Sequence, residues 1–292
     1  INDGLERTSQ PHKPSLIERH SMIIKPAPFE FLHSAITLPE FNTFAIQFGG
    51  VGIRWYALAY IAGLLVGIYI LRRESRLPGA LMTLDQTDRL LNYLLIGIIL
   101  GGRLGYVFFY NPGFYMANPL SVLRLWEGGM SFHGALIGVG FALFLMGRRH
   151  ELPFLAITDR VAMVTPIGLF LGRLSNFING ELYGRVTNVP WAMIFPHSDA
   201  QPRHPSQLYE AGLEGFLLGF LMYCFWRLGW LGKLGRLTGV FLFGYGMARF
   251  FVEFVRQPDS HIGLFGSILS MGQLLSFPMI IIGIYLLRQS WR

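Results

Sequence analysis

The sequence has few charged residues and only one cysteine. Charged side chains make up 14% of the 292 residues, whereas soluble domains have about 25%. The single cysteine, Cys224, excludes a disulfide framework and a metal site built from cysteines. No group of histidine, cysteine and aspartate residues has a spacing suited to metal ligation. We therefore expect neither a bound metal nor another cofactor.

The rest of the composition is typical of a helical protein that crosses a membrane several times. Hydrophobic residues reach 52%, aromatic residues reach 15%, and glycine occurs 35 times. The formal net charge of +7 is compatible with a nucleic-acid partner, but the basic residues fall between apolar segments and form no single patch. We interpret them as signals of membrane topology, and we expect no nucleic-acid partner.

The beginning of the chain lies outside this apolar framework. Residues 1–20 are polar, contain two prolines and have no apolar run, so they resemble neither a signal peptide nor a buried element. The chain begins with Ile1, which suggests a translated extension that precedes a true start at Met22. We expect residues 1–40 to be mostly disordered, with the part before Met22 dispensable, and residues 41–292 to form one domain.

Seven apolar segments in that domain predict an all-α polytopic membrane protein. Each is close to the roughly 20 residues that a helix needs to cross a bilayer. The seven segments are Arg54–Leu71, Leu90–Tyr110, Met130–Gly147, Leu155–Phe177, Leu208–Trp226, Leu237–Val255 and Ile268–Leu287.

The arginines and lysines of the connecting loops predict the orientation. Eleven lie in the loops after the first, third and fifth segments and after the seventh, and four lie on the opposite side. The positive-inside rule then places the C-terminus in the cytoplasm and the N-terminus outside. The loop 178–206 becomes a small extracytoplasmic head, in which Trp191–Phe195 is strand-like.

Polar residues within or beside the apolar segments predict a functional site, because ionisable groups in a membrane are costly. With a rise of about 1.5 Å per residue, several of them reach the outer half of the bilayer. These residues are Tyr56, Arg103, His133, Arg173, Arg249 and Glu253.

Helical spacing groups these residues further. Arg173 and Asn176 share one face. Two polar stripes also follow helical spacing and should face the interior of the bundle. The stripes are Tyr245, Arg249, Glu253 and Arg256, and Gln207, Glu210 and Glu214.

Each of these polar groups could instead have a purely structural role. Arg249 and Glu253 would form an ion pair that neutralises itself. Arg103 would snorkel toward the membrane surface or pair with Glu210 or Glu214. His133 alone would be a hydrogen-bonded packing residue. The combination at one depth favours a site, and two arginines at the outer leaflet suit the phosphate of a phospholipid headgroup.

Four motifs resemble the signature of the bacterial phosphatidylglycerol–prolipoprotein diacylglyceryl transferase family. The resemblance covers about residues 41–287, and Ser175 replaces a glycine that is usual in the family. The motifs are Gly129–Gly134, Gly172–Arg185, Arg203–Glu210 and Val252–Asp259.

This resemblance implies a seven-span transferase of the bacterial inner membrane, with a periplasmic head. The family moves the diacylglyceryl group of phosphatidylglycerol to the lipobox cysteine of a preprolipoprotein, and glycerol 1-phosphate is released. The implied partners are phosphatidylglycerol, the preprolipoprotein signal peptide and membrane lipids.

The resemblance also implies roles for individual residues. Arg173 and Asn176 would hold the lipid phosphate. Arg249, oriented by Glu253, would act on the leaving group or the thiol, and His133 would be the base. Tyr56 would be a further catalytic residue and would shape the pocket with Gly184. Glu181 would orient the loop or Arg173. The remaining expected site residues bind the substrate, namely Arg103 and Asn179.

Two other classes of function fit parts of the pattern. A lipid transporter or flippase would also have buried charges, although these should extend through the midplane to both sides. A scaffold whose ion pairs only fix the helix register would tolerate Arg173→Lys.

Overall fold

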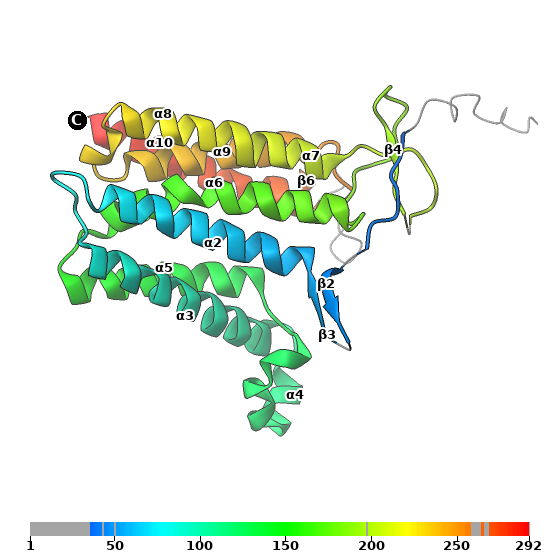
Figure 1. Cartoon of the computed structure of the whole chain (residues 1–292), viewed down its shortest axis with the longest axis horizontal. Coiled ribbons are helices and arrows are strands. Elements are labelled where there is room, and N and C mark those ends of the chain that lie inside the picture. Colours follow the sequence, from blue (N-terminus) through cyan, green and yellow to red (C-terminus); the bar gives the residue numbers. More distant parts are fainter. Residues whose placement is uncertain are drawn as a thin grey trace, which may run out of the picture.

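The computed structural model of the chain is an elongated bundle of helices with a small irregular region at one end (Figure 1). The extension before Met22, with its predicted disorder and dispensability, lies outside the residues that the structure describes. The described residues are 36–42, 44–49, 51–196, 198–257, 264–265 and 269–291.

Each of the seven predicted apolar segments contains a helix. One of them is a broken helix made of α7 (Ser206–Glu210), a π-helical segment η4 (Ala211–Leu217) and α8 (Leu218–Arg227). The other six are α2 (Trp55–Glu74), α3 (Leu84–Phe109), α5 (Phe132–His150), α6 (Phe154–Ile178), α9 (Arg236–Val252) and α10 (Met271–Trp291).

Five helices among the described residues are long and apolar enough to cross a membrane. They are α2, α3, α6, the broken helix at 206–227 and α10. Helix α9, with 17 residues, and helix α5 lie in the same bundle. The structure thus supports a polytopic helical membrane protein, while the count of seven spans stays a prediction.

Local signals fix where several helices begin. Thr83 and Gln86 form a reciprocal capping box at the start of α3, and Ser131 caps α5 by accepting from the N–H of Gly134. The start of α9 is capped by another helix. Asp159 of α6 accepts hydrogen bonds of 2.7 Å from the N–H groups of Gly235 and Thr238, which suits a carboxylate at a helix N-terminus.

Helices α3 and α5 pack closely because glycines line their contact. An added Cβ at any of these glycines would meet the backbone of the facing helix. In a membrane, small residues of this kind allow the backbones to approach and gain dispersion contacts. The glycines are Gly97, Gly101 and Gly105 on α3, and Gly134 and Gly138 on α5.

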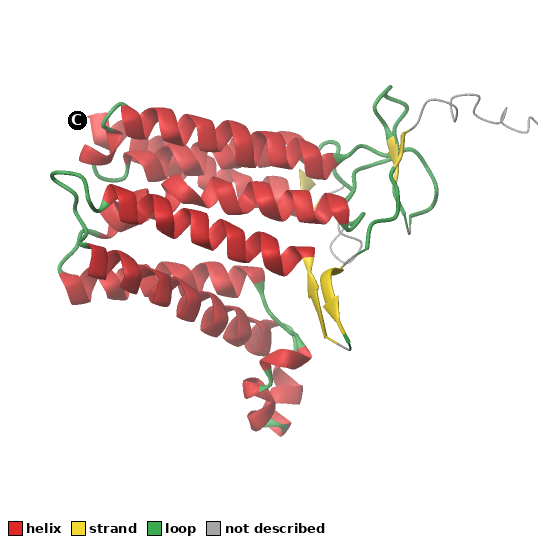
Figure 2. Ribbon diagram, viewed as in Figure 1, coloured by secondary structure: helices red, strands yellow, loops and turns green. Residues whose placement is uncertain are grey.

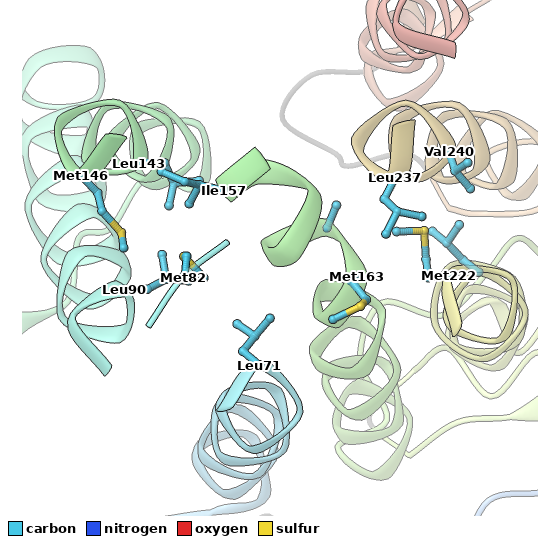
Figure 3. Close-up of a cluster of buried hydrophobic side chains, with 12 residues drawn as sticks. Leu71, Met82, Leu90, Leu143, Met146, Ile157, Met163, Met222, Leu237 and Val240 are labelled. Carbon is cyan, nitrogen blue, oxygen red and sulfur yellow. The ribbon is translucent and has the colours of Figure 1, made fainter. Parts of the chain in front are cut away.

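The main apolar core lies at the end of the bundle that we call the core end. Figure 3 shows Leu71, Leu90, Met146 and Ile157 of this core pointing toward one another from α2, α3, α5 and α6. A buried ion pair follows two of these core residues, since Glu74 comes three residues after Leu71 and Arg160 three residues after Ile157. In this pair, Arg160 Nη2 is 2.8 Å from Glu74 Oε1. Apolar packing and this pair together join α2 to α6.

The opposite end, which we call the head end, carries the strands and loop 179–205 (Figure 2). Strand β1 (Ile36–Thr37) pairs in parallel with β4 (Met193–Ile194), within the stretch predicted to be strand-like. The other strands form two antiparallel pairs, β2 (Phe44–Phe48) with β3 (Val51–Arg54) and β5 (Leu264–Phe265) with β6 (Leu269–Ser270).

An arm also extends from the head end, between the predicted segments Leu90–Tyr110 and Met130–Gly147. It contains α4 (Pro112–Ala117) and two 3₁₀ turns, η2 (Pro119–Leu123) and η3 (Leu125–Glu127). Figure 1 shows α4 projecting sideways from the bundle. Each element is too short to produce the periodicity of a longer helix, so the arm could not be predicted from an apolar pattern.

Candidate active site

Three arginines and three glutamates from different elements meet at the head end. We call this cluster the arginine–glutamate network. Its arginines come from α6, α9 and the turn after α9, and two of its glutamates come from the broken helix. The members are Arg173, Arg249, Arg256, Glu210, Glu214 and Glu253.

Glu210 lies at the centre of the network and has no exposed surface. Its Oε1 atom accepts hydrogen bonds from Arg249 Nη1 at 2.6 Å and from Arg256 Nη1 at 2.8 Å. Its Oε2 atom lies 3.0 Å from Arg173 Nη1, in an ion pair without hydrogen-bond geometry. One carboxylate therefore contacts three guanidinium groups.

The other two glutamates contact the network from its edges. Glu214 is also fully buried, and its Oε2 atom accepts from Arg173 Nη2 at 3.4 Å. Glu253 pairs with Arg249 Nη2 through Oε1 and accepts from Ser270 Oγ at 2.7 Å through Oε2. The predicted ion pair of Arg249 and Glu253 therefore exists, but within a larger network.

Arg173 and Arg249 are the members with the most exposed surface. Their side chains are each 17% exposed, whereas the glutamates are 4% or less. Each of these two guanidinium groups contacts two carboxylates, which leaves further N–H groups for a ligand. Together they suit an anion that has several oxygen atoms, such as a phosphate.

Two asparagines beside Arg173 are tied together by Glu181. Its Oε1 atom accepts from Asn176 Nδ2 at 3.1 Å and from Asn179 Nδ2 at 3.2 Å. Gln207 Nε2 donates to the backbone carbonyl of Glu181 at 2.7 Å. These bonds attach the start of the loop to the end of α6 and to the broken helix.

Buried side-chain oxygens that accept no hydrogen bond are concentrated around the arginine–glutamate network and the adjoining asparagines. Among the described residues, four buried side-chain oxygens have no hydrogen-bond partner, and all belong to this region. Such atoms are rare in native proteins and often mark functional sites. They are Asn179 Oδ1, Gln207 Oε1, Glu210 Oε2 and Glu214 Oε1.

Gly184 holds the head loop against the bundle. Its N–H donates to the carbonyl of His204, and its own carbonyl accepts from Arg203 Nη1 at 3.1 Å. A Cβ at this position would meet the carbonyl of Val255 and the backbone of His204. A glycine is therefore required for the close contact.

The pKa values of Asp199 and His204 in the head loop are shifted. Hydrogen bonds from Arg203 to both carboxylate oxygens of Asp199, at 3.0 and 2.7 Å, lower the pKa of Asp199. Partial burial lowers the pKa of His204, whose Nδ1 lies 3.2 Å from the hydroxyl of Tyr209. Asp199 therefore stays ionised at neutral pH, and the Arg203–Asp199 pair persists there.

Tyr56 lies at the start of α2, on the same side as the network. The hydroxyl of Tyr60 donates to the hydroxyl of Tyr56 at 3.2 Å. Tyr60 is within electrostatic range of Arg173 and Glu181. The two tyrosines therefore place a pair of hydroxyl groups near the end of α6.

His133 is exposed at the start of α5. In the part of the chain that the structure describes, its ring contacts Phe132, and no hydrogen bond or ion pair joins it to the network. The contacts neither support nor oppose its role as a base, which stays a prediction.

Arg103 has a different environment from the one we predicted. All five of its N–H groups donate to backbone carbonyls, and its guanidinium lies over the ring of Tyr115, 5.2 Å from the centroid. These carbonyls belong to the arm and the turn after it, namely Ser121, Val122, Arg124, Gly128 and Gly129.

The predicted pairing of Arg103 with Glu210 or Glu214 is therefore wrong. Those carboxylates bind the arginines of the network, and Arg103 attaches the arm to α3. Its role in substrate binding stays a prediction, but it has no free N–H group to offer.

The sequence matches one protein family over most of its length. The profile described as prolipoprotein diacylglyceryl transferase matches residues 43–289. The chain belongs to this family. Similar proteins include the phosphatidylglycerol–prolipoprotein diacylglyceryl transferase of Methylocella silvestris, which is 51% identical over 263 residues. That alignment covers 88% of this chain and 96% of the relative.

Two other relatives carry the same name. The Cereibacter sphaeroides protein is 48% identical over 289 residues, which cover 89% of this chain and 99% of the relative. The Photobacterium profundum protein is 46% identical over 257 residues, which cover 88% of this chain and 96% of the relative. This chain is thus similar to transferases over nearly their whole length, and none of these three relatives carries the name of a transporter.

Some members of the arginine–glutamate network were not among the predicted site residues. Glu210, Glu214 and Arg256 were predicted to lie on polar stripes, and the two glutamates were also predicted as alternative partners of Arg103. The sequence did contain a signal, because Glu210 and Glu214 are spaced by four residues, as expected for neighbours on one helical face. Spacing indicates a shared face, but not which side chains meet across helices.

Proposed function

We propose that this chain transfers the diacylglyceryl group of phosphatidylglycerol to the lipobox cysteine of preprolipoproteins, the first step of bacterial lipoprotein maturation. The observation that carries the proposal is the pair of partly exposed guanidinium groups, Arg173 and Arg249, held by buried carboxylates. A phosphodiester has the charge and the oxygen atoms that this pair can bind. The names of the relatives supply the two substrates.

The reaction forms a bond between sulfur and the glyceryl carbon and breaks the bond between that carbon and the phosphate oxygen. The electron pair of the broken bond stays on the phosphate, which leaves as glycerol 1-phosphate. Arg173 and Arg249 would stabilise the charge that develops on this leaving group. Asn176, positioned by Glu181, would donate to the lipid headgroup.

The thiol is a weak nucleophile until its proton, with a pKa of about 8.5, is removed. We propose that His133 accepts this proton, since it lies exposed at the head end of α5. Tyr56 and Gly184 would shape the pocket, the first by its hydroxyl pair with Tyr60 and the second by allowing close loop packing.

We also propose a localisation and an orientation for the chain in the membrane. All seven helical units would cross the bacterial inner membrane, with the N-terminus in the periplasm, the C-terminus in the cytoplasm and the head end outward. The charge distribution supports this, because the exposed pair Arg148 and Arg149 lies at the core end. The network would then meet phosphatidylglycerol of the outer leaflet.

A transfer assay tests the function directly. Purified protein in vesicles that contain labelled phosphatidylglycerol should add a diacylglyceryl thioether to a lipobox peptide and release glycerol 1-phosphate. A peptide with serine in place of the lipobox cysteine should not react, because it lacks the thiol. Movement of labelled lipid between leaflets without any transfer to the peptide would favour the transporter alternative.

Cysteine labelling in intact cells tests the orientation. In a Cys224→Ser background, a membrane-impermeant thiol reagent should label Asn188→Cys in the head loop and should spare Arg148→Cys at the core end. Both positions are exposed in the structure, so accessibility should depend on the side of the membrane. The reverse labelling pattern would contradict the proposed orientation.

A further inference from the structure

The role of Glu210 follows from its contacts with three arginines. We infer that Glu210 is the positioning residue that holds Arg173 and Arg249 in the arrangement needed to stabilise the phosphate group as it leaves. The inference rests on the proposed function, because it names a residue that acts through the two proposed phosphate ligands.

Glu210 cannot act on the substrate itself. It has no exposed surface, whereas two of the three arginines that it contacts, Arg173 and Arg249, have side chains that are 17% exposed. Its two carboxylate oxygens contact different arginines. Oε2 faces Arg173, and Oε1 accepts hydrogen bonds from Arg249 and Arg256. The carboxylate therefore sets the distance between guanidinium groups on two different helices, α6 and α9.

An ion pair that served only to stabilise the fold would not need the contacts that Glu210 makes. The pair of Glu74 and Arg160 at the core end shows the alternative, in which the two oxygens of one carboxylate bind Nε and Nη2 of a single guanidinium. Buried ion pairs often add little net stability, because both charges lose their hydration. Glu210 instead contacts each arginine through a single Nη atom, which leaves N–H groups of Arg173 and Arg249 for a ligand.

The charge balance of the network predicts that Glu210→Gln affects the binding of the lipid and the rate of transfer differently. Three arginines and three glutamates balance when all are ionised, so Glu210→Gln leaves one excess positive charge. The anionic lipid should then bind at least as well as before. The guanidinium groups, however, would repel each other without their shared carboxylate, and their arrangement toward the leaving phosphate would be lost.

The predicted result for Glu210→Gln is therefore a separation of kcat from KM. We expect kcat to fall by at least about 30-fold, since misplacement by 1 Å can cost about 100-fold, while the KM for phosphatidylglycerol does not rise. A loss confined to the transition state has this signature. Rates are measured per folded molecule, in vesicles with a lipobox peptide, alongside the Tm.

Glu74→Gln is the matched control. It makes the same change in another buried glutamate that pairs with an arginine, at the end remote from the network. It should lower the Tm and leave kcat within about threefold of wild type. If Glu210→Gln also keeps kcat within threefold, or loses activity only in proportion to the folded fraction, the inference is wrong.

A second variant keeps the test decisive if Glu210→Gln does not fold. Glu210→Asp retains the charge but shortens the side chain by one methylene, so it should lower kcat and leave KM unchanged. Wild-type kcat in Glu210→Asp, without a folded Gln variant, would overturn the inference. Failure of the wild-type protein to modify any lipobox peptide would instead reject the proposed function.

Discussion

Replacing Arg249 with lysine is expected to lower the transfer rate by at least about 100-fold, the scale seen when one transition-state donor is removed. Arg249 uses Nη1 for Glu210 and Nη2 for Glu253, and it still has N–H groups for a ligand. A lysine has one nitrogen, which cannot contact both carboxylates and a phosphate with the geometry of a planar guanidinium. Arg173→Lys should behave in the same way, because Arg173 contacts Glu210 and Glu214.

The control for this prediction is Arg227→Lys. Arg227 is exposed at the core end of α8, so the same substitution there changes no part of the network. The measurement is the transfer rate per folded molecule, with membrane levels compared by immunoblot. Near-normal rates for Arg173→Lys or Arg249→Lys would remove that residue from the phosphate site and favour the scaffold alternative.

The helices could be predicted from the sequence because their signal is long and local. The apolar segment Leu155–Phe177, for instance, appears as α6, Phe154–Ile178, with a difference of one residue at each end. Segment length and composition suffice for such a prediction. The segment Ile268–Leu287 begins later in the structure, since α10 starts at Met271.

The partners of the charged residues could be predicted only in part. Rise along a helix gives the depth of a side chain, so the gathering of Arg173, Arg249 and Glu253 was predictable. Depth says nothing about which face of a neighbouring helix lies opposite. For this reason Arg103 was paired with the wrong partners, although backbone carbonyls of the arm satisfy all its donors.

The arm illustrates a second limit. Its carbonyls become available to Arg103 only because short turns bring Ser121 and Gly128 near the same guanidinium. Neither turn has an apolar period that would reveal it in the sequence. Hydrogen bonds to backbone groups are independent of side-chain identity at the acceptor, so residue types alone do not predict them.

The contact between α3 and α5 gives the second large expected effect. Gly101→Ala should destabilise the protein by about 3 kcal/mol, the upper part of the usual range for overpacking. The new Cβ would overlap the carbonyl oxygen of Gly134 and the Cα of Gly138. These are backbone atoms, so they can give way only if the two helices move apart.

That movement should also affect the reaction. The N–H of Ser131 donates to the carbonyl of Gly102 at 2.8 Å, and this bond fixes the start of α5 against α3. His133 follows within the first turn of α5, so a shift of this helix would displace the proposed base. We therefore expect Gly101→Ala to lower both the Tm and the transfer rate.

Gly140→Ala is the matched control, because it adds the same methyl group to α5 at a position where nothing lies within 4 Å of the new Cβ. It should leave the Tm unchanged or raise it slightly, since alanine favours a helix more than glycine does. Thermal unfolding of both variants in the same detergent gives the comparison. A wild-type Tm for Gly101→Ala would mean that the close glycine contact does not stabilise the bundle, and a loss of rate in that variant would then need another explanation.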